Sequence, residues 1–355
     1  MTMIANLLQR ELFTPKTSYS PTTPVRVIGV GDAGCRAATQ VFGDRTANGN
    51  TTVFCIDTDS GSLDRSTCDR SLLLGPASFR GFGSGGDAAA LRRATEDAAA
   101  IIKEMVAGAE CVVIMAGASG ITGSTAAPIV ACMAREAGVL VAGIAFMPFE
   151  FERSSAHQHA EDAIAALHST CDGVLEVPAE ATGTGASLAA SLDQDRRYAG
   201  GFVRLLDSIF RRSRLSTYHP NSSGLRSVLS DGRRLVYASE CTTGTSTAAM
   251  ALSNCVHEIT ARGADPAQLG RALILVESTS DISTGLVAEL TATLESIAGS
   301  NVQVAVRHAR KPMLPGQVRV SLIGAIRESR RRLVFDELHN RLAELKSPGR
   351  VAVFI

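Results

Sequence analysis

The segment 116–128 constrains the fold of this chain more than any other, because it is a glycine-rich turn between two apolar stretches. Ahead of it, Cys111–Met115 is wholly apolar, which is typical of a short strand buried in a parallel sheet. Behind it, Ile129–Arg135 reads as an apolar helix that ends at Gly138. A strand-to-helix turn of this kind leaves backbone N–H groups free at the positive end of a helix, which suits phosphate. We therefore predict a phosphate-binding turn here.

Hydroxyl groups strengthen this prediction, because short Ser and Thr side chains add donors to the same turn. The candidate ligand-binding residues of the turn are Gly117, Ala118, Ser119, Gly120, Ile121, Thr122, Gly123 and Ser124.

A second turn of nucleotide-binding type lies nearer the start of the chain. Val25–Val30 reads as a strand, and 31–34 turns it into a helix that begins near Cys35. The glycines fit the Gly-x-Gly-x-x-Gly pattern of a dehydrogenase, and Asp57 ends the next strand as that pattern requires. A dehydrogenase does not account for the other phosphate turn, so we rank it last. The candidate binding residues here are Gly29, Gly31, Asp32, Ala33, Gly34 and Asp57.

Five segments in order resemble signatures of the FtsZ family, in the tubulin/FtsZ superfamily. Ile56–Leu63 closely resembles the family's Val-Asn-Thr-Asp-Ala-Gln-Ala-Leu, and Pro148–Glu152 matches Pro-Phe-x-Phe-Glu. The other three are a loose match at 29–37, the Gly-x-Gly-x-Gly loop at 81–85, and 119–128. The resemblance covers roughly residues 25–326. It implies an α/β fold in which a Rossmann-type GTP-binding domain is joined by a central helix to a smaller α+β domain.

The resemblance also implies domain boundaries, which we predict as follows. They are an N-terminal extension at 1–24, a nucleotide-binding domain at 25–187, a central helix and inter-subunit loop at 188–224, a second α/β domain at 225–326, and a C-terminal helix and strand at 327–355. The central helix is expected over Leu188–Arg212. Its candidate buried positions are Leu188, Leu192, Phe202, Leu205, Leu206 and Ile209.

By the same resemblance, the ligand is GTP or GDP, with Mg²⁺ as its accompanying ion. Glu152 would accept hydrogen bonds from the ribose, and Asp195, or else Asp193, would pair with the guanine. Some positions depart from the family. Ile121 and Thr125 replace glycines, so that Ile121 would crowd a phosphate or forbid the backbone angles of glycine. Asp32 and Ala33 also replace glycines, and a carboxylate at 32 repels a triphosphate unless magnesium or an arginine intervenes.

The family's catalytic loop, which enters the nucleotide site of the next subunit in a filament, falls at 213–224. His219, Asn221 and Gly224 occupy the positions of its Asn, Asp and Asp. Asn221 can orient a water but cannot accept its proton, Gly224 has no side chain, and His219 is a candidate base or a solvated loop residue. We assign no catalytic residue and expect hydrolysis to be slow or absent.

Charge and composition exclude some partners. Lys+Arg and Asp+Glu both number 35, so no net charge favours nucleic acid as the partner. The eight cysteines are expected to be reduced and buried, and no apolar run is long enough for a membrane span. We therefore expect a cytoplasmic protein.

The two ends of the chain are the segments the resemblance explains least. Ile4, Leu7, Leu8 and Leu12 have helical spacing, and 14–24 reads as a linker. The C-terminal segment has a basic run at 330–332, an apolar-faced helix and a strand-like end at 351–355. Each end either packs on its own domain or anchors the protein to a membrane or a membrane-associated protein.

The predicted function is head-to-tail self-association into filaments, with weakened GTP or GDP binding. Two alternatives remain open. One is an active GTPase of the FtsZ type in division or membrane remodelling. The other is a non-polymerising pseudoenzyme that regulates other FtsZ-type filaments.

Overall fold

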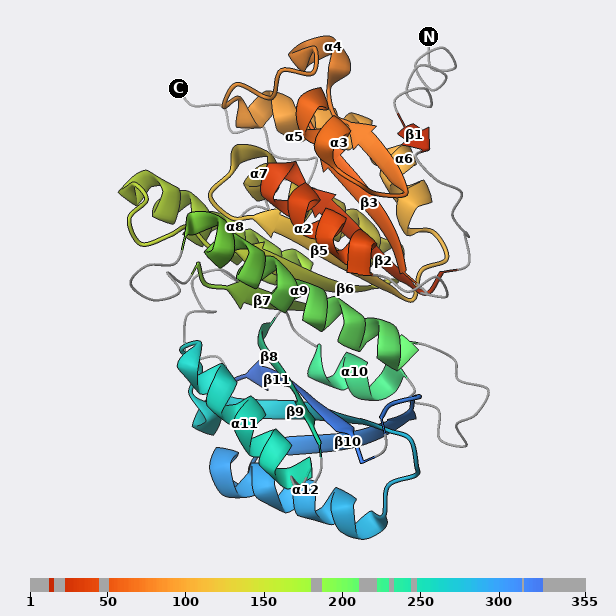
Figure 1. Ribbon diagram of the computed structural model, residues 1–355. Coiled ribbons are helices and arrows are strands. Elements are labelled where there is room, and N and C mark those ends of the chain that lie inside the picture. The colour runs from red at the N-terminus through yellow and green to blue at the C-terminus, as the bar shows by residue number, and fades with distance from the viewer. Residues whose placement is uncertain are drawn as a thin grey trace, which may run out of the picture.

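The computed structural model describes residues 13–15, 23–44, 51–179, 187–210, 222–229, 233–243, 248–314 and 316–327. Its described strands form one eleven-stranded sheet in the order β1-β4-β3-β2-β5-β6-β7-β8-β11-β9-β10. Helices cover both faces of the half that contains β2 to β7, and Figure 1 shows the other half below it, beyond the long helix α9. The predicted α/β class is confirmed.

Parallel strands make up the centre of the first half. They are β2 (Val25–Val30), β3 (Thr51–Asp57), β4 (Arg70–Leu73), β5 (Cys111–Gly117), β6 (Leu140–Phe146) and β7 (Gly173–Val177). Every residue of β2 and β3 is buried. The apolar runs are continuous because helices cover both faces of these strands.

The helices of this half are short to medium in length. They are α2 (Gly31–Asp44), α3 (Ser60–Arg65), α4 (Pro76–Phe79), α5 (Ala88–Asp97), α6 (Ala99–Val106), α7 (Ile121–Glu136) and α8 (Ser154–Thr170). The helix predicted at Ile129–Arg135 is only the second half of α7. Pro128 lies inside α7 and is buried. The glycine- and hydroxyl-rich sequence that suggested a loop therefore forms the first turns of this helix.

The segment β1 (Phe13–Pro15) corrects the prediction of a linker at 14–24. It pairs antiparallel with β4 at the edge of the sheet. Three residues with no apolar alternation carry too weak a pattern for a strand to be predicted. The helix expected from Ile4 to Leu12 lies outside the described residues, as do the elements predicted after residue 327.

Helix α9 (Leu188–Phe210) crosses between the two halves and packs against α2. Four of its predicted core residues are buried, namely Phe202, Leu205, Leu206 and Ile209. Leu188 is 54% exposed, contrary to the prediction, because it is the first residue of the helix. Leu192 is half-buried.

The second half has its own strands and helices. They are β8 (Arg233–Thr242), β9 (Leu269–Ser278), β10 (Gln303–Arg310), β11 (Val318–Ile326), α10 (Ser222–Val228), α11 (Ala248–Ala261), η1 (Pro266–Gln268) and α12 (Thr284–Ala298). β8 joins the first half through parallel pairing with β7, at Gly173–Leu175 against Arg233–Leu235. The predicted division of the chain into domains stays a prediction.

The cysteines differ in part from the prediction. None of the eight forms a disulfide, and six are buried, but Cys132 is exposed and Cys241 is half-buried. Cys132 lies on the outer face of α7, whereas Val130, Ala131 and Ala134 face the core. An apolar run on a helix does not place every residue inside, because only one face packs on the sheet.

Candidate functional site

Two helix N-termini meet at the carboxyl edge of the parallel sheet. α2 begins at Gly31, directly after β2, and α7 begins at Ile121, with three residues between it and the end of β5. β2 and β5 are adjacent parallel strands, so both helix dipoles present their positive ends to the same place. This arrangement suits a ligand with more than one phosphate.

Glycines let the two turns approach each other closely. Gly31 has a φ of +73°, and a Cβ there would lie 3.1 Å from the backbone nitrogen of Gly123. A Cβ on Gly117 would lie 3.0 Å from the Cβ of Ala33. Thr58, the residue after β3, adds a hydroxyl contact, since its Oγ1 lies 3.3 Å from Thr122 Oγ1. The structure therefore brings the candidate residues of both turns together.

Ile121 does not force a strained backbone. It is the first residue of α7, and Arg80 is the only non-glycine residue with a positive φ among those described. The expectation that Ile121 would forbid a backbone angle that needs glycine is therefore wrong. Gly120, before the helix, has open space where a Cβ would be. The hydroxyl of Ser124 donates to the Ile121 carbonyl at 3.2 Å, so it serves the helix.

The negative charge of the Asp32 carboxylate would repel a bound phosphate, and arginines neutralise this charge. Its Oδ2 accepts from Arg36 Nε at 2.9 Å, and its Oδ1 accepts from the Ser62 hydroxyl at 3.2 Å. Arg65 lies 4.0 Å from Oδ1. The condition that an arginine offsets this negative charge is therefore met.

Two buried polar atoms beside the turns have no hydrogen-bond partner among the described residues: Asp57 Oδ2 and Ser84 Oγ. Asp57 is 3% exposed, and its other oxygen accepts from the Thr58 amide at 2.7 Å. Burial raises the pKa of Asp57, and the nearby Ser62 hydroxyl and the backbone offset only part of this rise.

Ser84 belongs to the predicted loop at 81–85, although the sequence alone did not single it out. A bridge between Asp59 and Phe82 holds this loop beside the end of β3. From the sequence alone, only the presence of a glycine-rich loop could have suggested that this segment contacts the end of β3. A buried carboxylate oxygen and a buried hydroxyl that lack partners are the atoms a bound ion or ligand would satisfy.

The residues predicted to contact the ribose and the guanine are placed less favourably. Glu152 Oε1 accepts from the Phe149 amide at 2.9 Å, and the rings of Phe149 and Phe151 stack with centroids 5.1 Å apart. Asp195 is 5% exposed, so it is not a solvated helix-surface acid. Asp193 is exposed and pairs with Arg196 at 2.8 Å.

The predicted catalytic positions are described only in part. His219 and Asn221 lie outside the described residues. Gly224 lies within α10, so the backbone at this position is helical and no longer part of a loop.

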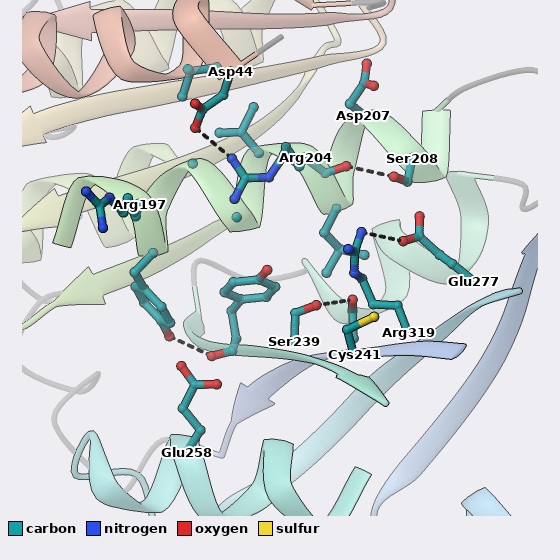
Figure 2. Close-up of a pocket in the computed structure, with 18 of the residues that line it drawn as sticks. Asp44, Arg197, Arg204, Asp207, Ser208, Ser239, Cys241, Glu258, Glu277 and Arg319 are labelled. Atoms are coloured by element: carbon teal, nitrogen blue, oxygen red, sulfur yellow. Dashed lines mark hydrogen bonds and ion pairs between the residues drawn. The ribbon is translucent and has the colours of Figure 1, made fainter. Parts of the chain in front are cut away.

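A cavity of about 650 Å³ lies away from the glycine turns, between α9 and the strands of the second half (Figure 2). Buried Glu277 contacts Lys311 and lies 3.4 Å from Arg319, and Lys311 Nζ donates to the Ser208 hydroxyl on α9 at 2.6 Å. Tyr198 on α9 donates to the Tyr237 carbonyl at 2.7 Å. Sequence reasoning missed this cleft, because its lining comes from segments far apart in the chain.

Other kinds of site are not seen in the part of the chain that the structure describes. There, no three His, Cys, Asp or Glu side chains are grouped so as to hold a metal ion. None of the helices in the described ranges is long and apolar enough to cross a membrane.

Comparison with known proteins agrees with this geometry. Residues 24–185 match the Tubulin/FtsZ family, GTPase domain. The chain is 26% identical over 299 residues to the cell division protein FtsZ of Pseudomonas aeruginosa, covering 83% of this chain and 75% of that protein.

Solved structures share the fold. A point mutant of FtsZ from M. jannaschii superposes with a TM-score of 0.73 at 21% identity, covering 91% of this chain and 94% of that one. The GTPγS-bound protofilament of CetZ2 from Haloferax volcanii gives a TM-score of 0.68 at 20% identity, covering 91% and 99%. The sheet and the two glycine turns agree with these matches: residues 24–185 resemble the GTPase domain of the Tubulin/FtsZ family, and the chain is an FtsZ-like protein of the tubulin superfamily.

Proposed function

We propose that this chain binds a guanine nucleotide at the two glycine turns, assembles head to tail into filaments, and hydrolyses the nucleotide slowly or not at all. The observation that carries nucleotide binding is the meeting of two helix N-termini beside two unpartnered buried polar atoms. The family match adds GTP or GDP as the expected ligand.

The residues present fit such a ligand. The backbone amides at the start of α7 and around Gly31 would hold phosphate oxygens, because they are the unbonded donors of a helix start. Asp57 Oδ2 would hold Mg²⁺ beside the phosphates, since carboxylate oxygen is a ligand that Mg²⁺ prefers. Arg36 and Arg65 keep the Asp32 carboxylate neutralised, so that its repulsion of a phosphate is reduced.

Slow hydrolysis is supported by what the chain lacks at one position. Hydrolysis of GTP needs an oriented water and stabilisation of charge at the transferred phosphate. Gly224 lies in α10 and offers no side chain for either task.

Filament formation is supported by relatives. One structural neighbour is a CetZ2 protofilament, and another is described as an FtsZ dimer. A head-to-tail contact between copies that does not close on itself generates an open filament.

The test is phosphate release from GTP as a function of protein concentration, with electron microscopy of the same samples. We expect filaments and little release. Release that rises steeply with concentration would show a working site completed between subunits, which would refute slow hydrolysis and favour an active GTPase. Neither release nor filaments would refute self-assembly and favour the regulatory pseudoenzyme.

A further inference from the structure

The charged side chains of this neutral chain are divided unevenly between its two halves. Residues 1–187 hold 13 Lys and Arg against 20 Asp and Glu, so their net charge is −7. Residues 211–355 hold 19 against 12, so their net charge is +7. Helix α9 lies between the halves and carries three residues of each sign, so assigning it to either half changes neither value.

The residues that the structure describes show the same division. In the first half they include 10 Lys and Arg against 18 Asp and Glu, and in the second half, beyond α9, 10 against 7. An ion pair joins the halves, since Arg234 Nε on β8 lies 3.4 Å from Glu176 Oε2 on β7. This pair offsets one charge of each sign and leaves most of the difference in place.

The opposite charges lie at opposite ends of the molecule. Figure 1 shows the first half on one side of α9 and the second half on the other. The field of so many charges extends past the protein surface, because the Debye length is about 10 Å at 0.1 M salt. An approaching molecule therefore meets one acidic end and one basic end.

A bound nucleotide would increase this difference. Both glycine turns belong to the first half, at the starts of α2 and α7. The phosphates of a guanine nucleotide there would add negative charge to the end that is already acidic.

A second copy of this chain is the partner that fits both ends. When copies meet head to tail, the basic end of one faces the acidic end of the next, whereas a head-to-head contact brings like charges together. A nucleic acid or an anionic membrane would match the basic end alone. The complementary charges within one chain therefore favour self-association.

We propose that the opposite charges of the two halves steer copies of this chain into head-to-tail contact, so that salt controls the rate of assembly. This inference rests on the proposed function, because it concerns how the copies in a filament find each other.

The test compares two double variants that have the same net charge. Glu161→Lys with Asp162→Lys changes two exposed residues of α8 and leaves the halves at −3 and +7. Glu289→Lys with Glu295→Lys changes two exposed residues of α12 and leaves the halves at −7 and +11. A thermal melt checks that both variants fold, which is expected because exposed substitutions alter stability by only about 0.5 kcal/mol.

The initial rate of assembly with GTP is followed by light scattering at low and high KCl, and the osmotic second virial coefficient measures attraction between unassembled copies. For the original chain we expect the rate to fall at least about tenfold between about 50 and 500 mM KCl. At low salt the α8 variant should assemble at least about threefold more slowly than the α12 variant. At high salt the three chains should converge, because the charges are screened.

Equal rates and equal virial coefficients for the two variants, or a rate that does not depend on salt, would overturn the proposal. Electron micrographs that show side-by-side pairs would also overturn it, as would binding to phosphatidylserine vesicles by a chain without self-attraction. If no filaments form at either salt concentration, the proposed self-assembly is refuted, and the virial coefficients of the two variants still decide whether opposite halves attract each other.

Discussion

A single methyl group at position 34 would test how the first turn packs on the sheet. Gly34 is the fourth residue of α2, and a Cβ there would lie 2.1 Å from the carbonyl oxygen of Met115 in β5. An ordinary contact between carbon and a carbonyl oxygen is about 3.3 Å or longer. Gly34→Ala must therefore move α2 away from β5 by about 1.2 Å.

Relief of this clash costs free energy, because the neighbouring atom belongs to the backbone of a central strand. Overpacking of this kind costs typically about 1–3 kcal/mol, and here we expect about 3 kcal/mol. The helix propensity of alanine returns roughly 0.5–1 kcal/mol. The net loss is about 2 kcal/mol, which lowers Tm by about 3 °C for a chain of this size.

Calorimetric melting of the apo protein would measure this change. Gly43→Ala is a matched control in the same helix, because Gly43 is exposed and has nothing within 4 Å of an added Cβ. We expect Gly43→Ala to leave Tm unchanged or raise it slightly. If Gly34→Ala melts at the same temperature as the original chain, then α2 and β5 do not touch through this glycine, and our account of the turn fails.

Two other substitutions test buried polar groups. Asp57→Asn should stabilise the apo protein by about 1 kcal/mol near pH 7, because a buried carboxylate oxygen without a partner is costly. Since folding raises the pKa of Asp57, the stability of the original chain falls as pH rises through that folded pKa. The gain should therefore vanish below about pH 3.9, the ordinary pKa of Asp, and a gain that is independent of pH in urea titrations would contradict this cause. Tyr198→Phe should lower the free energy of unfolding by about 1 kcal/mol through loss of its hydrogen bond to the Tyr237 carbonyl, and no change in urea titration would show that this bond contributes nothing.

The sequence predicted the turns well, because their signals are local. The run Cys111–Met115 followed by glycines fixes a buried strand and a turn without help from distant residues. The start of α7 could not be predicted in the same way. Glycine and hydroxyl residues favour loops on their own, whereas here Ile121 and Thr122 begin a helix that packs closely against Gly31 of the first turn.

The side chains that surround the turns could not be predicted from the sequence, for a different reason. Asp32 alone predicts repulsion of a phosphate, but Arg65 lies beside it only because α3 packs against α2. The buried hydroxyl of Ser84 likewise lies beside the end of β3 only because the loop at 81–85 pairs there. No local sequence pattern predicts which side chains from distant segments will lie in contact.

The pairing of β7 with β8 gives the molecule a direction in which it resists force. Three residue pairs, Gly173–Leu175 with Arg233–Leu235, continue the sheet from one half into the other. A pull along these strands loads their hydrogen bonds together in shear, whereas a pull across the sheet opens them one after another. We therefore expect the pairing of β7 with β8 to resist a pull along the strands better than a pull across the sheet.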